Sequence, residues 1–188
     1  DGGGTWEWMN GLDERPFYYS QVRVDPKDPN RVYWSSTPVR FSNDGGRSVG
    51  TTTQGIHVDH HAMWIDPNDA NHIVVGNDGG VAQSWDKGGN WDFLNTMPLG
   101  QFYAVSFDMA VPYRVCGGLQ DNGSWCGPSR RAGGGITNAM WFNAGGGDGF
   151  YTAQDPRNPN VLYSESQGGS MQRIDYRTNE RTTLRKPN

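Results

Sequence analysis

Short apolar runs separated by turn residues dominate this chain. The runs are rich in Val, Ile, Tyr, Phe, Trp and Thr, and clusters of Gly, Asn, Asp and Pro bound them. No long stretch has the periodicity of an amphipathic helix, so the pattern predicts an all-β protein. The predicted strands lie at 17–25, 31–35, 39–42 and just after 48, then at 58–66, 73–76, 81–84 and 91–94, then at 101–108, 114–117, 124–126 and 140–142, and finally at 149–155, 161–165, 171–175 and 182–185.

Two motifs recur through these strands with a period of about 42 residues. One has a serine two residues before an aspartate, with glycines and then Trp or Ser after it. The other is an aspartate that usually precedes proline. The aspartates are Asp1, Asp44 and Asp86 in the first motif and Asp25, Asp66, Asp108 and Asp155 in the second. Four strands per period predict the blades of a β-propeller, whereas the repeat of a β-solenoid, the alternative, is usually shorter.

The repeat divides the chain into four blades, at about 15–52, 56–95, 100–143 and 147–188. An additional apolar run at 5–9 predicts an orphan outer strand within residues 1–10. Four whole blades and one orphan strand favour about four blades of a larger ring, with residues 1–188 forming part of a single propeller domain. A four-bladed ring closed by the orphan strand is the less favoured arrangement.

Composition narrows the classes of partner. Eight tryptophans and eight tyrosines supply large apolar side chains for packing between sheets. A formal net charge of −4 argues against a nucleic-acid partner, which would require a basic stripe. No apolar run approaches the length of a membrane span. We also expect no cofactor.

The serine–aspartate motif resembles the Asp-box, or BNR repeat, of sialidases, sortilin-type propellers and xyloglucan-degrading endoglucanases. The segments GLQDNGSW at 118–125, GDGFY at 147–151 and YSESQGG at 163–169 are similar to large secreted bacterial proteins with sortilin-like propellers, often labelled glycosyl hydrolase. The resemblance implies an extracellular or periplasmic propeller. It does not fix a function, because one fold supports many functions.

One register position is a candidate ligand site. The residue seven positions before each aspartate of the second motif is Tyr18, Asp59, Gln101 or Asp148. This position begins the innermost strand, at one mouth of the central channel. With His60, these residues are the predicted ligand-binding set. The alternative is that they are polar only because they face water.

The densest ionisable segment contains His57, Asp59, His60 and His61. Strand alternation would point Asp59 and His61 to one side and His60 to the other. His57 and His61 are weak metal-ligand candidates, but the spacing matches no known metal signature. The favoured interpretation is a structural histidine, with no metal site, although one histidine could act as a general base.

Glycoside hydrolysis requires two carboxyl groups about 5–10 Å apart. The catalytic candidates are Asp59, Asp148 and Glu165. A sialidase is disfavoured, because the arginines offered for its arginine cluster do not converge on one face. These are Arg15, Arg23 and Arg40.

Asp78 and Asp121 occupy equivalent positions after the second strand of their blades, and we expect tight hairpin turns there. Cys116 and Cys126 flank the Asp121 turn symmetrically. A hairpin would bring them face to face, and the secreted interpretation favours a disulfide over a reduced pair.

Two functions follow from these patterns. The first is an extracellular propeller that binds or scaffolds a glycan or protein partner, alongside the remaining blades of the ring. The second is a carbohydrate-active hydrolase with its site at the channel mouth. Because no catalytic set is complete, the sequence favours binding.

Overall fold

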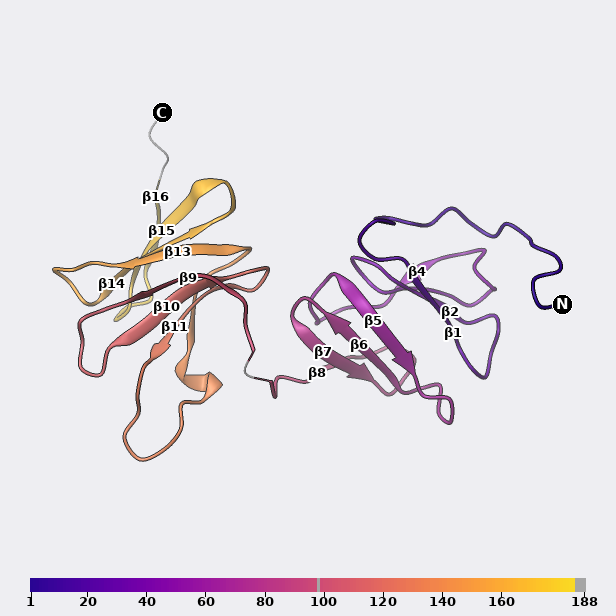
Figure 1. Ribbon diagram of the computed structural model, residues 1–188, viewed down its shortest axis with the longest axis horizontal. Helices are drawn as coiled ribbons and strands as arrows, with labels where there is room; N and C mark the ends of the chain where they lie inside the picture. The colour runs from indigo at the N-terminus through magenta and orange to yellow at the C-terminus, as the bar shows by residue number, and fades with distance from the viewer. Residues whose placement is uncertain (98, 185–188) are drawn as a thin grey trace. The chain divides into compact units, whose positions relative to one another are not determined.

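The computed structural model describes residues 1–97 and 99–184 of the chain. Its strands form four four-stranded antiparallel sheets, and its helical segments are two short 3-10 turns, Asn138–Met140 and Gln167–Gly169 (Figure 1). The predicted all-β class is therefore confirmed. One predicted strand extends to Arg185, which lies outside the described residues.

Each sheet is built from four strands that follow one another along the chain, which is the topology of a propeller blade. The first sheet contains β1 (Gln21–Val24), β2 (Val32–Ser35), β3 (Arg40–Ser42) and β4 (Gly50–Thr51). The second contains β5 (His60–Ile65), β6 (Ile73–Asn77), β7 (Gly80–Ser84) and β8 (Asp92–Phe93). The third contains β9 (Phe102–Phe107), β10 (Arg114–Leu119), β11 (Gly123–Pro128) and β12 (Phe142–Gly145), and the fourth contains β13 (Gly149–Gln154), β14 (Val161–Ser166), β15 (Ser170–Asp175) and β16 (Arg181–Leu184).

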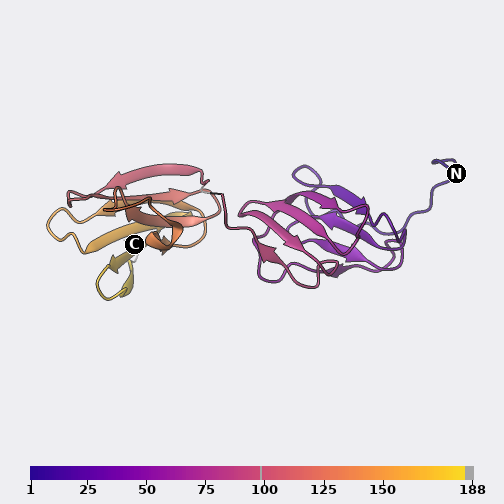
Figure 2. The same ribbon diagram turned by 90° about the horizontal axis from the view of Figure 1, so that it is seen from below.

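The chain divides into two compact units, Asp1–Met97 and Pro98–Asn188, each holding two sheets (Figure 2). In the first unit β5 of the second sheet packs on β1 and β2. In the second unit β13 of the fourth sheet packs on β9, β10 and β11. Each unit therefore repeats one contact, in which the first strand of the later sheet packs on the earlier sheet.

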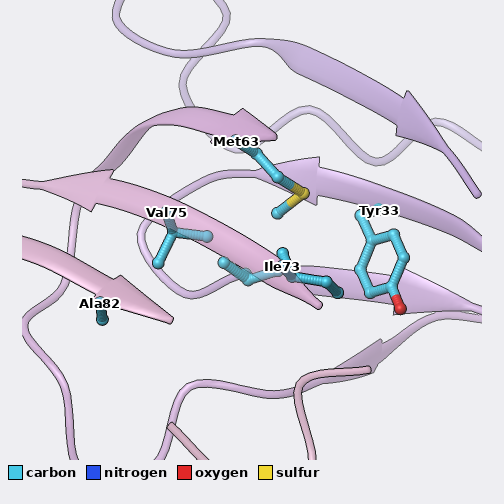
Figure 3. Packing of buried hydrophobic residues seen from close by; sticks show 6 residues of the cluster. Tyr33, Met63, Ile73, Val75 and Ala82 are labelled. Carbon is cyan, nitrogen blue, oxygen red and sulfur yellow. The ribbon is translucent and has the colours of Figure 1, made fainter. Parts of the chain in front are cut away.

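Apolar side chains from both sheets fill the core of the first unit (Figure 3). Its buried members are Tyr33, Val39, Met63, Ile73, Val75 and Ala82. Tyr33 comes from the first sheet and Met63 from the second, so the core lies between the sheets. Burial of a valine, isoleucine or methionine side chain here contributes about 1.5–3 kcal/mol.

The core of the second unit contains the predicted disulfide. Cys116 and Cys126 are cross-strand partners on β10 and β11 and are joined by an S–S bond of 2.05 Å. The symmetric spacing of the two cysteines around the Asp121 turn therefore predicted the pairing correctly. Nearby, Gly118 and Gly149 let the two sheets approach closely, since a Cβ on Gly118 would lie 2.1 Å from the carbonyl carbon of Gly149.

The serine–aspartate motif builds the turn between the third and fourth strands of a sheet. Ser84 Oγ accepts the backbone N–H of Gly88 at 2.8 Å and donates to Asp86 Oδ1 at 2.8 Å. Asp86 Oδ1 also accepts the backbone N–H of Asn90 at 2.8 Å. The same bonds recur around Ser42 and Asp44. Each motif thus satisfies turn donors that would otherwise lack partners.

Residues 5–9, where the orphan outer strand is predicted, are not paired with another strand in the described chain. The segment after them crosses the first sheet. The Asn10 side-chain amide donates to the carbonyl of Gly46, and Glu14 binds Arg40 and Ser36. An outer strand needs a neighbouring strand for its backbone groups, and the described chain places none beside residues 5–9.

Candidate functional site

The structure places the predicted register position at one end of every sheet. Asp59 and Asp148 immediately precede β5 and β13, Gln101 immediately precedes β9, and Tyr18 lies shortly before β1. In each case the residue lies where the chain enters the first strand of its sheet.

In the first unit, a mixed polar and aromatic group surrounds Asp59. We call Arg15, Tyr18, Tyr19, Asp59 and His61 the Asp59 cluster. The Tyr19 hydroxyl donates to Asp59 Oδ1 at 2.9 Å, and Arg15 Nη1 lies 4.0 Å from Asp59 Oδ2. Arg15 Nη1 also lies 3.5 Å from the Tyr19 hydroxyl. The carboxylate of Asp59 is therefore held between a phenol and a guanidinium.

Tyr18 is the solvent-exposed aromatic residue of the cluster, whereas Tyr19 is buried. The ring of Tyr18 is 43% exposed. The Arg15 guanidinium lies 4.3 Å from its centroid, a cation–π contact. The His61 ring meets Tyr18 edge-on, with centroids 4.7 Å apart. One exposed aromatic ring thus has fixed polar neighbours on two sides.

His61 also connects the cluster to a turn. Its Nε2 lies 3.0 Å from Oδ1 of Asp78, which lies in the predicted turn between β6 and β7. The pairing orients the imidazole beside Tyr18. Asp78 is therefore both a turn residue and a neighbour of the cluster.

Contacts through Asp59 join the two sheets of the unit. The backbone N–H of Asp59 donates to the carbonyl of Thr37 at 2.9 Å, and that of His60 donates to Ser36 at 2.9 Å. The Tyr19 hydroxyl also hydrogen-bonds the Thr37 hydroxyl. Asp59 has a φ of 59°, an unusual left-handed conformation for a non-glycine residue. The cluster is therefore held on a fixed junction between sheets.

His60 faces away from this surface. Its side chain is fully buried, and neither ring nitrogen has a hydrogen-bond partner among the described residues. Burial lowers the pKa of the ring to about 4, so the imidazole is neutral at physiological pH. The predicted alternation is correct, because His61 is partly exposed while His60 is buried. A buried ring offers no atom to a ligand at this surface.

In the second unit, Asp148 joins its two sheets in a similar way. Its Oδ1 accepts the backbone N–H of Asp121 at 2.6 Å, and its Oδ2 accepts Gln167 Nε2 at 3.0 Å. Gln101 contributes its backbone carbonyl to the N–H of Gln120. Both oxygens of Asp148 are thus engaged in holding turns. This arrangement is typical of a structural carboxylate.

The third catalytic candidate, Glu165, borders a polar pocket of about 220 Å³. Ser164, Ser166, Gln172 and Thr183 also line this pocket. Ser164 and Gln172 already donate to the carbonyl of Ala144. The Glu165 carboxylate has no hydrogen bond or ion pair to the rest of the described chain.

The arginines considered for a sialidase site go to different places. Arg15 belongs to the Asp59 cluster, whereas Arg23 Nε donates to the Met63 carbonyl at 3.1 Å. Arg40 binds Glu14, whose pKa is lowered first by a hydrogen bond from Ser36 and further by Arg40. These contacts give each arginine a separate role.

Metal sites and membrane spans are the other two classes of site to consider in residues 1–97 and 99–184. No group of three His, Cys, Asp or Glu residues in these ranges could hold a metal ion. His57 Nδ1 lies 3.0 Å from the Val58 carbonyl, and His61 pairs with Asp78. No helix in the same ranges has the length and apolarity to cross a bilayer.

Sequence reasoning missed Tyr19 as part of the cluster and considered Arg15 only for a sialidase. Tyr19 follows the register position by one residue, and its hydroxyl reaches the next sheet. The signal that could have found it is the pair of adjacent tyrosines, because adjacent residues in extended chain point to opposite faces. Arg15 lies in an irregular segment, where periodicity gives no direction.

Comparisons with known proteins give remote likenesses. Neither the protein-family models nor the curated proteins contain a match. Among solved structures, the chain is similar to an ancestral GH74 enzyme, with 15% identity and a TM-score of 0.41 over 91% of this chain and 24% of that one. It is also similar to the GH74 xyloglucanase from Xanthomonas campestris, with 15% identity and a TM-score of 0.35 over 87% of this chain and 29% of that one.

A third likeness is to YCF48 bound to a D1 peptide, with 15% identity and a TM-score of 0.40 over 98% of this chain and 60% of that one. The chain thus spans about a quarter of the GH74 enzymes' length and three fifths of YCF48's. Identities and TM-scores at this level are too low to transfer a function.

Proposed function

We propose that this chain is a binding or scaffolding module, built from Asp-box propeller blades that belong to one ring, and that it acts outside the cytoplasm. The Asp59 cluster is its ligand site for a glycan or a protein partner. One observation supports this most strongly: the half-exposed Tyr18 ring lies between Arg15 and His61 on a rigid junction. The disulfide agrees with an oxidising compartment.

The chemistry of the cluster suits a ligand that offers both a flat apolar face and polar groups. A sugar ring or a peptide segment could stack on Tyr18 while its polar groups meet Arg15 and Asp59. Because the cluster is tied to the backbone of both sheets, little ordering would accompany binding.

Loss of the Tyr18 ring should weaken binding. Glycan and peptide arrays would identify a ligand, and titration calorimetry would give its Kd for the wild type and for Tyr18→Ala. We expect Kd to rise about 2–13-fold, since an aromatic contact contributes about 0.5–1.5 kcal/mol. Tyr113→Ala, which removes another half-exposed tyrosine, is the matched control and should leave Kd unchanged. Equal effects of the two substitutions would contradict the site.

A glycoside hydrolase is the second candidate, favoured by Glu165 at the polar pocket, whose carboxylate has no partner among residues 1–97 and 99–184. Hydrolysis would require a second carboxyl group within reach of Glu165. Incubation of the wild type and Glu165→Gln with mixed polysaccharides, followed by a reducing-end assay, tests it. Release of sugar by the wild type alone would support hydrolysis, and release by neither would leave the binding function.

A further inference from the structure

One register position shows which sheet faces are covered. The residue three positions before each aspartate of the second motif is Val22, Met63, Val105 or Thr152. Met63 and Thr152 are 6% and 7% exposed, because they face the preceding sheet of their own unit. Val22 is 49% exposed on the first sheet and Val105 is 60% exposed on the third, because neither sheet has a preceding sheet within its own unit. Val24, on the same face as Val22, is 53% exposed. The first sheet thus carries an apolar face of the kind that the second sheet buries.

The exposure of a tryptophan also indicates that the first unit has an uncovered face. In the second sheet, Trp91 follows its motif aspartate by five residues and packs on the first sheet. Its Nε1 donates to the carbonyl of Thr52, just beyond β4, at 2.5 Å. Trp6 stands at the same place after Asp1, and 91% of it is exposed. Trp6 therefore has the position of an interface residue without the interface.

The complementary face lies on the fourth sheet. In the first unit, the face that meets the second sheet carries Gln21, Arg23 and Tyr33, and Tyr33 is fully buried there. The corresponding positions of the fourth sheet are Tyr151, Ala153 and Tyr163. Tyr151 is 69% exposed, and Tyr163 is only partly buried. This face is the kind on which another sheet packs.

We propose that the open face of the first sheet binds the fourth sheet of a second copy of this chain. The contact would repeat the packing already seen between sheets within each unit. Val22 and Val24 would lie against Tyr151 and Tyr163, and Trp6 would donate to a backbone carbonyl of the outer strand. Since the two faces differ, the association is heterologous, head to tail.

Sedimentation velocity over about 5–200 µM protein measures this association. The wild type should reach at least twice the mass of the 20.8-kDa chain. Val22→Asp places a charge on one face and Tyr151→Asp on the other. Each should raise the dissociation constant at least about tenfold. Val111→Asp, a substitution of a 93% exposed valine in a turn, is the control and should not change it.

Circular dichroism would first verify that each variant is folded. A wild type that stays monomeric throughout, or a Val22→Asp variant that associates like the control, would overturn the proposal. Cross-linking distinguishes a contact between two copies from a contact within one chain. A photo-reactive residue at position 22, in a mixture of light and ¹⁵N-labelled chains, should give mixed-isotope products containing residues 149–175. Cross-links only within single chains would overturn the proposal.

Discussion

Asp59 and His60 are adjacent in the chain but have opposite environments. Asp59 lies at an exposed cluster with two polar partners, whereas His60 is buried with none among the described residues. Strand alternation separates them, and this difference was predictable from the sequence. The lowered pKa of His60 has a consequence for stability.

His60 should make folding stability depend on pH. Its pKa is about 4 in the folded protein, against 6.5 in the unfolded chain. Between these values the unfolded chain binds more protons, so stability falls as pH falls. The loss should be about 2 kcal/mol, after allowing for relaxation around the ring. Urea unfolding from about pH 7.5 to about pH 4.5 measures it.

His60→Leu removes the titrating ring and should flatten this part of the pH profile. His57→Gln, which changes a partly buried histidine, is the control and should retain the slope. An unchanged slope in His60→Leu would show that other groups cause the pH dependence.

At this scale the sequence predicted where several residues lie, and their ligand-binding role stays a prediction. The register of the second motif placed Tyr18, Asp59, Gln101 and Asp148 at sheet ends, where the structure has them. It could not give the contacts of Tyr19 or Arg15, because these depend on the distance between sheets. It also could not separate Asp59 from Asp148, whose two oxygens hold turns.

At the scale of elements, the serine of the serine–aspartate turn should matter more than its exposed neighbours. Ser84 is buried, and its hydroxyl accepts the N–H of Gly88. Ser84→Ala would leave that donor without a partner and should lower the free energy of unfolding by about 1–3 kcal/mol. Ser170→Ala, an exposed serine, should change it by less than about 0.5 kcal/mol. Chemical denaturation compares the two, and similar small values would contradict the role of the turn.

The close approach of the third and fourth sheets should not tolerate a side chain. Gly118→Ala places a Cβ 2.1 Å from the Gly149 carbonyl carbon, so a strand must move. We expect a loss of at least about 3 kcal/mol, or failure to fold, from overpacking. Gly134→Ala, whose Cβ meets nothing within 4 Å, is the control. Thermal unfolding, followed by circular dichroism, gives the Tm of each variant. Equal Tm values for the two variants would contradict the close packing.

The strand predictions were accurate to a few residues because turn residues bound each apolar run. Residues 5–9 have no strand partner in the described chain. An apolar run indicates that a segment can pair, but pairing also needs a neighbouring strand. The bonds of Asn10 and Glu14 instead hold the following segment across the first sheet.

At the scale of the whole molecule, the 42-residue period correctly predicted four four-stranded sheets. The period cannot give the ligand or the number of blades in a ring, since these depend on surfaces and contacts that the repeat does not encode. The proposed binding function depends on which ends of the sheets a ligand occupies. The Asp59 cluster is at one end, and the serine–aspartate turns are at the other.

Hydrogen–deuterium exchange with and without the ligand found on the arrays tests this claim most directly. The account predicts slower exchange on binding in the segments around Arg15–Tyr19, Asp59–His61 and Asp78, with no change at the serine–aspartate turns. Protection confined to residues 42–48 and 84–91 would contradict it and place the ligand at the opposite ends of the sheets.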